Sequence, residues 1–173
     1  RLFIEKAWHY PQALDSAGGW GESGSYGTYI WFRVTLLSDA VKRITKGRMN
    51  LFASPRYPLL TQWFMSIMQP DERGFIPFSN CGQWLDGVAP TLYRLAREYG
   101  DGHAQWLASR ISDRVNSADM FSFLWSDPEV EAKPSTDLPL AKLFPGISWT
   151  MLRNKWDDPN ATWAFFGAGP SYA

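Results

Sequence analysis

The stretch GGWGESGSYGTY, residues 18–29, gathers side chains that could bind and react with a ligand just ahead of a long apolar run. Tyr26 and Tyr29 carry phenols, which can donate or accept a proton when a neighbouring group lowers their pKa from about 10. Glu22 adds a carboxylate, and Trp20 adds a flat apolar ring of the kind that stacks on a sugar. The glycines permit tight turns or close approach of the backbone to a ligand. This stretch is therefore the first candidate for a functional site.

Each of these residues also has a structural interpretation. A carboxylate ahead of a helix stabilises its N-terminus by roughly 0.3–1 kcal/mol, so Glu22 could cap the helix instead of contacting a ligand. Trp20 could fill a core. Tyr29 lies one helical turn after Tyr26 and could share the same side of the helix. Spacing alone therefore leaves either phenol as the reactive one.

Further residues could border the same site. Arg33 could pair with a carboxylate or a sulfate, or it could be an ordinary arginine on a helix surface. The polar loop FSNCGQWLDG, residues 78–87, carries Trp84, which could form part of a cleft. Asp86 in the same loop could instead cap the helix that follows. These residues are weaker candidates than the tyrosines.

Several function classes are not supported by the sequence. Two histidines and a single cysteine, Cys81, show no ligand spacing, so we expect no metal site and no disulfide within the chain. Neither a Ser-His-Asp pattern nor a phosphate loop occurs, because GAGPSYA lacks the strand–loop–helix setting of a nucleotide fingerprint. Basic and acidic residues balance at 17 each, and the apolar runs are short. We therefore expect no nucleic-acid partner and no membrane span.

Aromatic residues are unusually abundant. Ten Trp, seven Tyr and eleven Phe make up 16% of the 173 residues, and many of them flank Gly, Pro or Asn instead of recurring at core spacing. Large rings beside loops are typical of ligand grooves, and their apolar faces suit the C–H faces of sugars. Many of these rings should nevertheless fill the core of a domain of this size.

Hydrophobic periodicity predicts helices from about residue 25 to residue 126. In residues 26–47, apolar side chains recur at steps of three and four residues, which indicates a largely buried helix. These positions are Ile30, Val34, Leu37, Val41 and Ile44. A second helix is expected to begin at Pro55 after a Ser54 cap and to stop before Pro70.

Three shorter helices should follow. APTLYRLAREYG predicts a helix closed by Gly100, and DGHAQWLASRIS predicts one capped by Asp101. SADMFSFLWSD, residues 117–127, predicts a short last helix. The helical part should therefore consist of several helices joined by short connections.

The pattern changes after residue 126. Residues 127–145 contain four prolines and scattered charge, which predicts a linker or an exposed strap. Apolar alternation then predicts two strands around a turn at residues 157–160, that is, an antiparallel hairpin. A lone hairpin is marginally stable in water, and the second strand nearly reaches residue 173. We therefore expect the chain to be a fragment that ends at the opening of a β-domain.

Two motifs, GGWGESGSYGTY with its apolar helix and FPGISWTMLRNKWDDPNATWAFFGAGPSYA after the Pro-rich strap, resemble the heparinase II/III-like polysaccharide lyases. That family joins an (α/α) toroid of helical hairpins to an antiparallel β-sandwich and includes heparin/heparan and alginate lyases. The resemblance implies a mainly α chain. Residues 1–126 would be the C-terminal part of the toroid, 127–145 a linker and 146–173 the first hairpin of the sandwich.

The resemblance also implies an activity, the cleavage of a uronic-acid polysaccharide by β-elimination. In this reaction a base removes the C5 proton, polar groups stabilise an enolate-like intermediate, and an acid protonates the departing O4. Tyr26 matches the proton-transferring tyrosine of the family best, with Tyr29 as the alternate. The residues expected to bind substrate are Trp20, Glu22, Arg33 and Trp84.

Other expectations concern what lies around these residues. The family's carboxylate-neutralising Asn or His and its His-bearing sandwich motif would lie outside residues 1–173, so we expect this fragment to be inactive without the remainder of its own polypeptide. The resemblance implies a periplasmic or extracellular protein. No cofactor is expected within the fragment, and the structural divalent metal of some relatives would use ligands beyond residue 173.

Two alternatives stay open. In an α/α-toroid glycoside hydrolase, Glu22 and Asp86 would be the two catalytic carboxylates. A sugar-binding module without activity would use the same aromatic residues. The substrate is also open between alginate and heparin/heparan types, although a chain with no net charge and few clustered arginines favours a nonsulfated polymer such as alginate.

Overall fold

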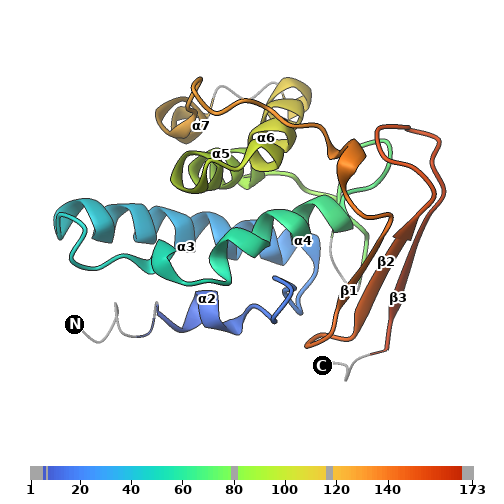
Figure 1. Cartoon of the computed structure of the whole chain (residues 1–173), viewed down its shortest axis with the longest axis horizontal. Helices are drawn as coiled ribbons and strands as arrows, with labels where there is room; N and C mark the ends of the chain where they lie inside the picture. Colours follow the sequence, from blue (N-terminus) through green and yellow to red (C-terminus); the bar gives the residue numbers. More distant parts are fainter. Residues whose placement is uncertain (1–5, 7, 79–81, 116–118, 169–173) are drawn as a thin grey trace.

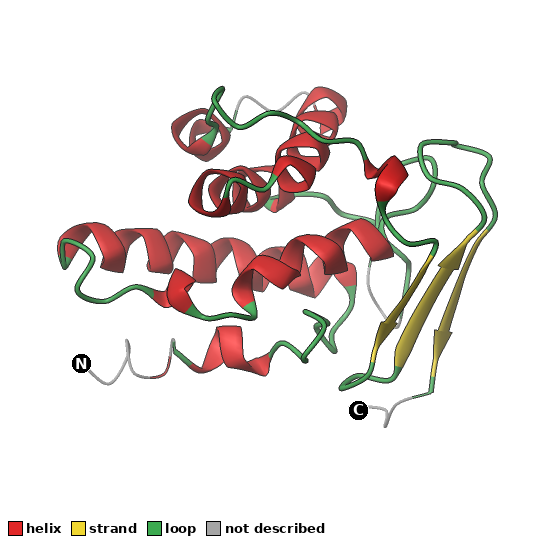
Figure 2. Cartoon of the chain, viewed as in Figure 1, coloured by secondary structure: helices red, strands yellow, loops and turns green. Residues whose placement is uncertain are grey.

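The computed structural model describes residues 6, 8–78, 82–115 and 119–168, with the backbone alone at residues 114 and 115. The chain is mainly helical, and a small antiparallel sheet stands at one end of the helices (Figures 1 and 2). This much of the expected architecture is confirmed, whereas the toroid and the sandwich stay predictions. In the described part of the chain, no helix is both long and apolar enough to cross a bilayer.

Two helices occupy the middle of the molecule, with α5, α6 and α7 above them and α2 below in Figure 1. The helices are α2 (His9–Ala13), α3 (Gly24–Ile44), α4 (Leu60–Ile67), α5 (Val88–Tyr99), α6 (Gly102–Val115) and α7 (Met120–Trp125). Short 3-10 turns lie at η1 (Leu51–Ala53), η2 (Tyr57–Leu59) and η3 (Ser135–Asp137). Helices α3 and α4 are the central pair.

The predicted helix ends are confirmed where capping residues mark them. Gly100 adopts a left-handed conformation, with φ of 64°, directly after α5. The Asp101 carboxylate accepts hydrogen bonds from the backbone N–H groups of His103 at 3.0 Å and Ala104 at 3.1 Å, which caps α6. Asp119 caps α7 in the same way through Phe121. Gly100 and Asp101 therefore marked the helix ends predicted from them, whereas the Ser54 cap did not mark a helix start.

The predicted start of the second helix is wrong. Helix α4 begins at Leu60, not at Pro55, and the intervening residues form turns. In a helix starting at Pro55, Pro58 would lack the N–H that must bond to the carbonyl of Ser54. The chain therefore uses short 3-10 turns until it has passed Pro58, and α4 ends at Ile67, three residues before the expected stop.

The buried side of α3 is not its most apolar side. Ile44, the last member of the predicted apolar stripe, is 81% exposed, and Ile30 and Leu37 are only half-buried. The buried positions are mostly small or polar. They are Gly24, Ser25, Gly27, Thr28, Trp31, Val34, Thr35, Ser38, Asp39 and Val41.

Two buried hydroxyls on this side of α3, those of Thr35 and Ser38, are satisfied by Tyr57 and the helix backbone. The Tyr57 hydroxyl lies 2.9 Å from the Thr35 hydroxyl and 3.5 Å from that of Ser38, which also donates to the carbonyl of Val34 at 2.6 Å. Burial raises the pKa of Tyr57 to about 12. Because each hydroxyl has a partner, the polar residues of α3 can be buried without a large desolvation cost.

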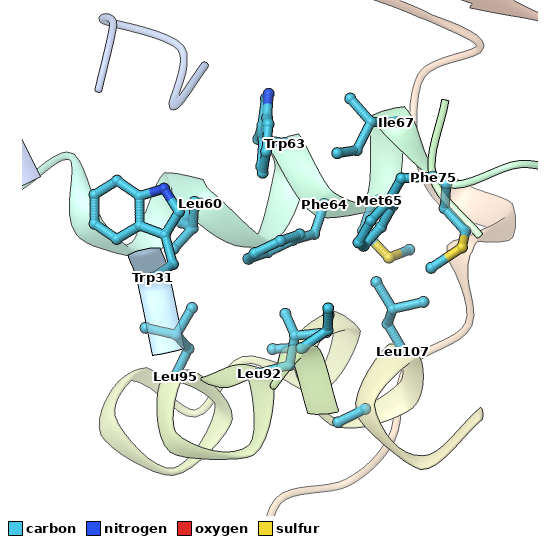
Figure 3. Packing of buried hydrophobic residues seen from close by; sticks show 14 of the residues in the cluster. Trp31, Leu60, Trp63, Phe64, Met65, Ile67, Phe75, Leu92, Leu95 and Leu107 are labelled. Carbon is cyan, nitrogen blue, oxygen red and sulfur yellow. The ribbon is translucent and has the colours of Figure 1, made fainter. Parts of the chain in front are cut away.

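A single large core joins α3, α4, α5 and α6. Figure 3 shows Leu60 and Phe64 of α4 pointing toward Leu92 and Leu95 of α5, and all four side chains are fully buried. Trp31 of α3 lies beside this layer and has no exposed surface. The core holds α3 rigidly, which matters because α3 carries the candidate tyrosines.

The glycines of residues 18–29 allow close packing of α3. A Cβ atom on Gly27 would lie 2.4 Å from the Trp63 ring, and one on Gly24 would lie 2.4 Å from Phe75. Gly18 has a positive φ of 90° in the turn before α3. The Gly-rich composition therefore serves contacts with the core as well as the turn that the sequence suggested.

The sheet has three antiparallel strands in the order β1-β2-β3: β1 (Ala141–Phe144), β2 (Trp149–Arg153) and β3 (Trp163–Gly167). The predicted β2–β3 hairpin is confirmed. Residues 127–145 were expected to form a linker or strap throughout, but residues 141–144 form strand β1 and pair with β2. The strand has four residues, and its inward positions are Lys142 and Phe144, so apolar alternation did not reveal it.

Arg153 joins the sheet to the helices. Its guanidinium donates to the carbonyl oxygens at the end of α4, those of Met65 at 3.4 Å, Ser66 at 3.1 Å and Met68 at 3.1 Å. The guanidinium also stacks on the ring of Trp156, 3.6 Å from its centre. Burial lowers the pKa of Arg153 to about 10, which leaves it charged at neutral pH. This cation therefore occupies the negative end of the α4 dipole.

Candidate functional site

One groove, with a volume of about 790 Å³, collects most of the candidate residues. It lies between the N-terminal part of α3, the loop before α5 and Asp119, the residue that caps α7. The sequence candidates that line it are Glu22, Tyr26, Tyr29, Arg33, Trp84 and Asp86. Residues more than 50 positions apart in the chain are thus brought to one place.

Helical geometry explains the α3 wall of the groove. Tyr26, Tyr29, Ile30 and Arg33 follow one another at steps of three, one and three residues, so they share one side of the helix. Tyr26 is 49% exposed and Tyr29 is 54% exposed. The opposite side of α3 packs into the core, so the helix that carries the two phenols is held in place beside the groove.

The two phenols differ in their surroundings. The Arg33 guanidinium lies 3.4 Å from the centre of the Tyr29 ring, a cation–π contact, and it donates to the Tyr29 carbonyl oxygen at 2.9 Å. Among the residues that the structure describes, none forms a hydrogen bond with the Tyr26 hydroxyl. The Tyr29 hydroxyl likewise has no hydrogen-bond partner in the described part of the chain, so both phenol hydroxyls are open to a bound ligand, and the cation beside the Tyr29 ring is the difference between them.

The carboxylates of the groove are not used as expected at the helix ends. Ser23 and Gly87 occupy the N-cap positions before α3 and α5, and neither N-terminus has a side-chain cap hydrogen bond. Glu22 and Asp86 therefore make no capping hydrogen bond in this structure, and both remain available in the groove. No ion pair involves either of them within the described residues.

Trp84 is the most exposed aromatic residue of the groove, at 68%. A Cβ atom on Gly82 would come within 2.9 Å of the Trp84 indole nitrogen. The absence of a side chain at Gly82 lets the indole lie close to its own loop. The indole of Trp84 therefore packs against the backbone of its own loop at Gly82, and the rest of the ring remains exposed and available for stacking.

Trp20 is placed elsewhere. The ring is half-buried against the core and meets Trp31 edge-on, with ring centres 5.4 Å apart. Its indole N–H is buried and has no acceptor among the described residues. Trp20 does not belong to the groove lining, so the structure separates it from the tyrosines and Glu22 with which it shares the Gly-rich stretch.

The sequence analysis did not place Ile30, Phe32 and Asp119 at the site, although all three line the groove. Ile30 and Phe32 could have been found from their helical spacing to Tyr26 and Tyr29. Asp119 was visible as a potential helix cap, but nothing in the sequence places the α7 turn beside α3. That contact depends on Phe32, which packs edge-on against Phe121 with ring centres 5.5 Å apart.

No metal-binding group of three or more His, Cys, Asp or Glu side chains is found in the described ranges. Comparison of the sequence with protein-family models and with curated proteins finds no match. The function of the chain must therefore be argued from the chemistry of the groove.

Proposed function

We propose that the groove binds a uronic-acid-containing polysaccharide, of the alginate or heparin/heparan type, and that the protein cleaves it by β-elimination with Tyr26 as the proton-transferring residue. The protein would then be a polysaccharide lyase built, as the sequence resemblance implies, on an (α/α) toroid joined to a β-sandwich. Its location would be periplasmic or extracellular on the same ground.

One observation carries the proposal: five of the six residues expected from the sequence to react with or bind a substrate line the same groove. They are Glu22, Tyr26, Tyr29, Arg33 and Trp84. The volume of about 790 Å³ falls within the range of ligand sites, and exposed aromatic rings beside charged groups suit sugars. Within the described structure, Glu22 forms no capping hydrogen bond at the start of α3, which leaves its carboxylate oxygens free to bind a ligand.

The reaction requires two proton transfers. When the C4–O4 bond of a 4-linked uronate breaks, the C5–H electron pair becomes the C4=C5 double bond, the C5 proton goes to a base, and O4 takes a proton from an acid. The Tyr26 hydroxyl supplies the proton to O4. In a syn elimination the same oxygen, as a phenolate, first takes the C5 proton and then passes it to O4. Tyr29 is the alternate residue for this role.

The C5 proton is weakly acidic, so the neighbouring carboxylate must be neutralised. Arg33 is the only Lys or Arg among the described lining residues, and its guanidinium retains donors beyond the one used on Tyr29. A substrate carboxylate paired with Arg33 would place its sugar next to the two phenols. Trp84 provides a stacking surface for a neighbouring sugar.

A glycoside hydrolase is the second candidate function, because Glu22 and Asp86 both line the groove and neither forms an ion pair with another described residue. Hydrolysis would use one carboxyl group as the acid and the other as base or nucleophile. The products separate the two reactions, since elimination leaves an ultraviolet-absorbing unsaturated uronide and hydrolysis leaves none.

The deciding experiment treats the full-length protein with a panel of uronic polysaccharides and measures the absorbance of released products. Tyr26→Phe should lower kcat by about 10²- to 10⁴-fold because it removes the general acid. Tyr10→Phe is the matched control, since Tyr10 is an exposed tyrosine outside the groove, and it should keep full activity.

Other outcomes are equally informative. If Tyr29→Phe lost activity and Tyr26→Phe kept it, Tyr29 would be the proton-transferring residue in place of Tyr26. Saturated products, with activity lost in Glu22→Gln, would establish the hydrolase. Binding of polysaccharide without any cleavage, unchanged in Tyr26→Phe, would identify a sugar-binding module.

A further inference from the structure

The groove carries more negative than positive charge, a property that cleavage of a uronate does not require. Glu22, Asp86 and Asp119 contribute three carboxylates, whereas Arg33 contributes the single guanidinium of the described lining. The chain as a whole has no net charge. The imbalance is therefore a local property of the groove.

The three carboxylates have no cation beside them. Within the described part of the chain, no salt bridge involves Glu22, Asp86 or Asp119, and the hydrogen bond known for Asp119 comes from the backbone N–H of Phe121 at 2.8 Å. Like-charged side chains that line a concave surface reinforce one another's field. A ligand that enters the groove must meet this negative potential.

We propose that the groove selects a nonsulfated saccharide of low charge density, in which one uronate pairs with Arg33 and uncharged sugars lie against Glu22, Asp86 and Asp119; this selects an alternating heparan-type backbone over alginate, in which every sugar carries a carboxylate. This inference rests on the proposed function, because it assumes that a uronate-containing chain occupies the groove. It assigns the carboxylates a role in specificity.

Hydrogen-bond chemistry supports this selection. Ionised carboxylates only accept hydrogen bonds, and sugar hydroxyls and acetamido N–H groups can donate to them. Sulfate groups only accept and are negatively charged, so a sulfate beside Asp86 or Asp119 would be repelled and would leave the carboxylate without a donor. The aromatic surface of Trp84 favours the uncharged C–H faces of sugars in the same way.

The test compares two probes with the same sugar backbone: a heparin hexasaccharide, and the same hexasaccharide with its O-sulfates removed and its N-sulfates replaced by N-acetyl groups. Binding is measured by titration calorimetry on the full-length Tyr26→Phe variant, which should cleave the probes at least about 10²-fold more slowly, and at low ionic strength, where charge effects are largest. The desulfated probe should bind at least about tenfold more tightly than the sulfated one. Added salt should reduce the difference.

Variants that neutralise the groove carboxylates test whether these carboxylates cause the difference in affinity between the two probes. The double variant Asp86→Asn with Asp119→Asn should bring the two affinities within about threefold of each other. Asparagine is also a good N-cap, so α7 should remain intact. Glu129→Gln with Glu131→Gln is the matched control, because these exposed residues lie outside the groove and the same two charges are removed.

Trp84→Ala separates failure of this inference from failure of the proposed function. If Trp84→Ala weakens binding of both probes but the sulfated probe binds as tightly as the desulfated one, the selectivity is overturned and the uronate-binding groove remains. If neither probe binds, or if Trp84→Ala changes neither affinity, the proposed function and this inference both fail.

Discussion

Among the described residues, charged and polar side chains are paired with one another at the C-terminal end of α3 and largely unpaired at its N-terminal end. At its C-terminal end, Asp39 and Lys42 belong to a network that is paired and largely buried. At its N-terminal end, Glu22 and Tyr26 lie in a groove without a polar partner among the described residues. The same helix thus contains a region built for stability and a region whose polar groups are left available to a ligand.

The paired region centres on Arg94. Its guanidinium lies 2.7 Å from the Asp39 carboxylate and 2.9 Å from that of Glu98, and the residue is only 5% exposed. Asp39 also binds Arg43 at 2.7 Å, and Glu98 binds Lys42. Each carboxylate therefore has two cations, so the desolvation cost of burial is offset.

The comparison indicates where substitutions should affect folding and where they should affect binding. Removing a member of the paired network leaves a buried charge, whereas removing a groove side chain exposes nothing new. Stability measurements can therefore distinguish the two ends of α3.

Arg94→Met should destabilise the protein by about 3–5 kcal/mol, because it leaves Asp39 and Glu98 without their shared partner in a buried position. Urea denaturation followed by circular dichroism measures the loss. Arg33→Met in the groove is the control and should change the free energy of unfolding by less than about 0.5 kcal/mol. Equal losses in the two variants would contradict the division between the two ends.

Gly27→Ala should destabilise the protein by about 1–3 kcal/mol, because the added methyl group would overlap the Trp63 ring. Thermal or urea unfolding measures the cost. In a Trp63→Leu background the same substitution should cost less, since the overlapping ring is gone. An undiminished cost in that background would show that the Trp63 contact is not the cause.

Asp39 should make stability fall in acid. Burial raises the pKa of Asp39, but its hydrogen bonds to Arg94 and Arg43 and their charges outweigh this effect, so the pKa lies below its usual value. The ionised carboxylate therefore stabilises the fold above about pH 4, the unfolded pKa, and this contribution is lost as the pH falls through the lower folded pKa.

The measurement compares the free energy of unfolding of the wild type and of Asp39→Asn between pH 7 and pH 2. Their difference should be constant above about pH 5 and should shrink below pH 4, because asparagine does not titrate. If this difference stayed constant between pH 7 and pH 2, ionisation of Asp39 would not be the cause of the loss of stability in acid.

Asp86→Asn should have the smallest effect on stability, within about 0.5 kcal/mol, because no cation or helix cap depends on this carboxylate in the described structure. Urea denaturation checks it beside Arg94→Met. A loss larger than about 1 kcal/mol would show that the groove carboxylate has a structural role after all.

Local chemistry made several parts of this fold predictable from the sequence. Asp101 and Gly100 marked helix ends correctly because capping depends on residues close in the chain. The tyrosine side of α3 followed from helical spacing. These features need no knowledge of distant contacts.

Other parts depended on tertiary contacts and could not be predicted. The buried side of α3 was misassigned because Thr35 and Ser38 are satisfied by Tyr57, which comes from a distant turn. Trp20 was grouped with Glu22 by sequence, yet it packs on Trp31. Asp119 joins the groove only through the packing of α7 on Phe32.

The position of Arg153 has a consequence for motion between the helices and the sheet. Swinging the sheet away would strip three carbonyl oxygens of α4 of a shared donor and would take the indole of Trp163 from the carbonyl of Ser66, 3.3 Å away. Rotation of the sheet about the Pro-rich residues 127–140 would therefore break every one of these hydrogen bonds, so we expect the sheet and α4 to move as one body.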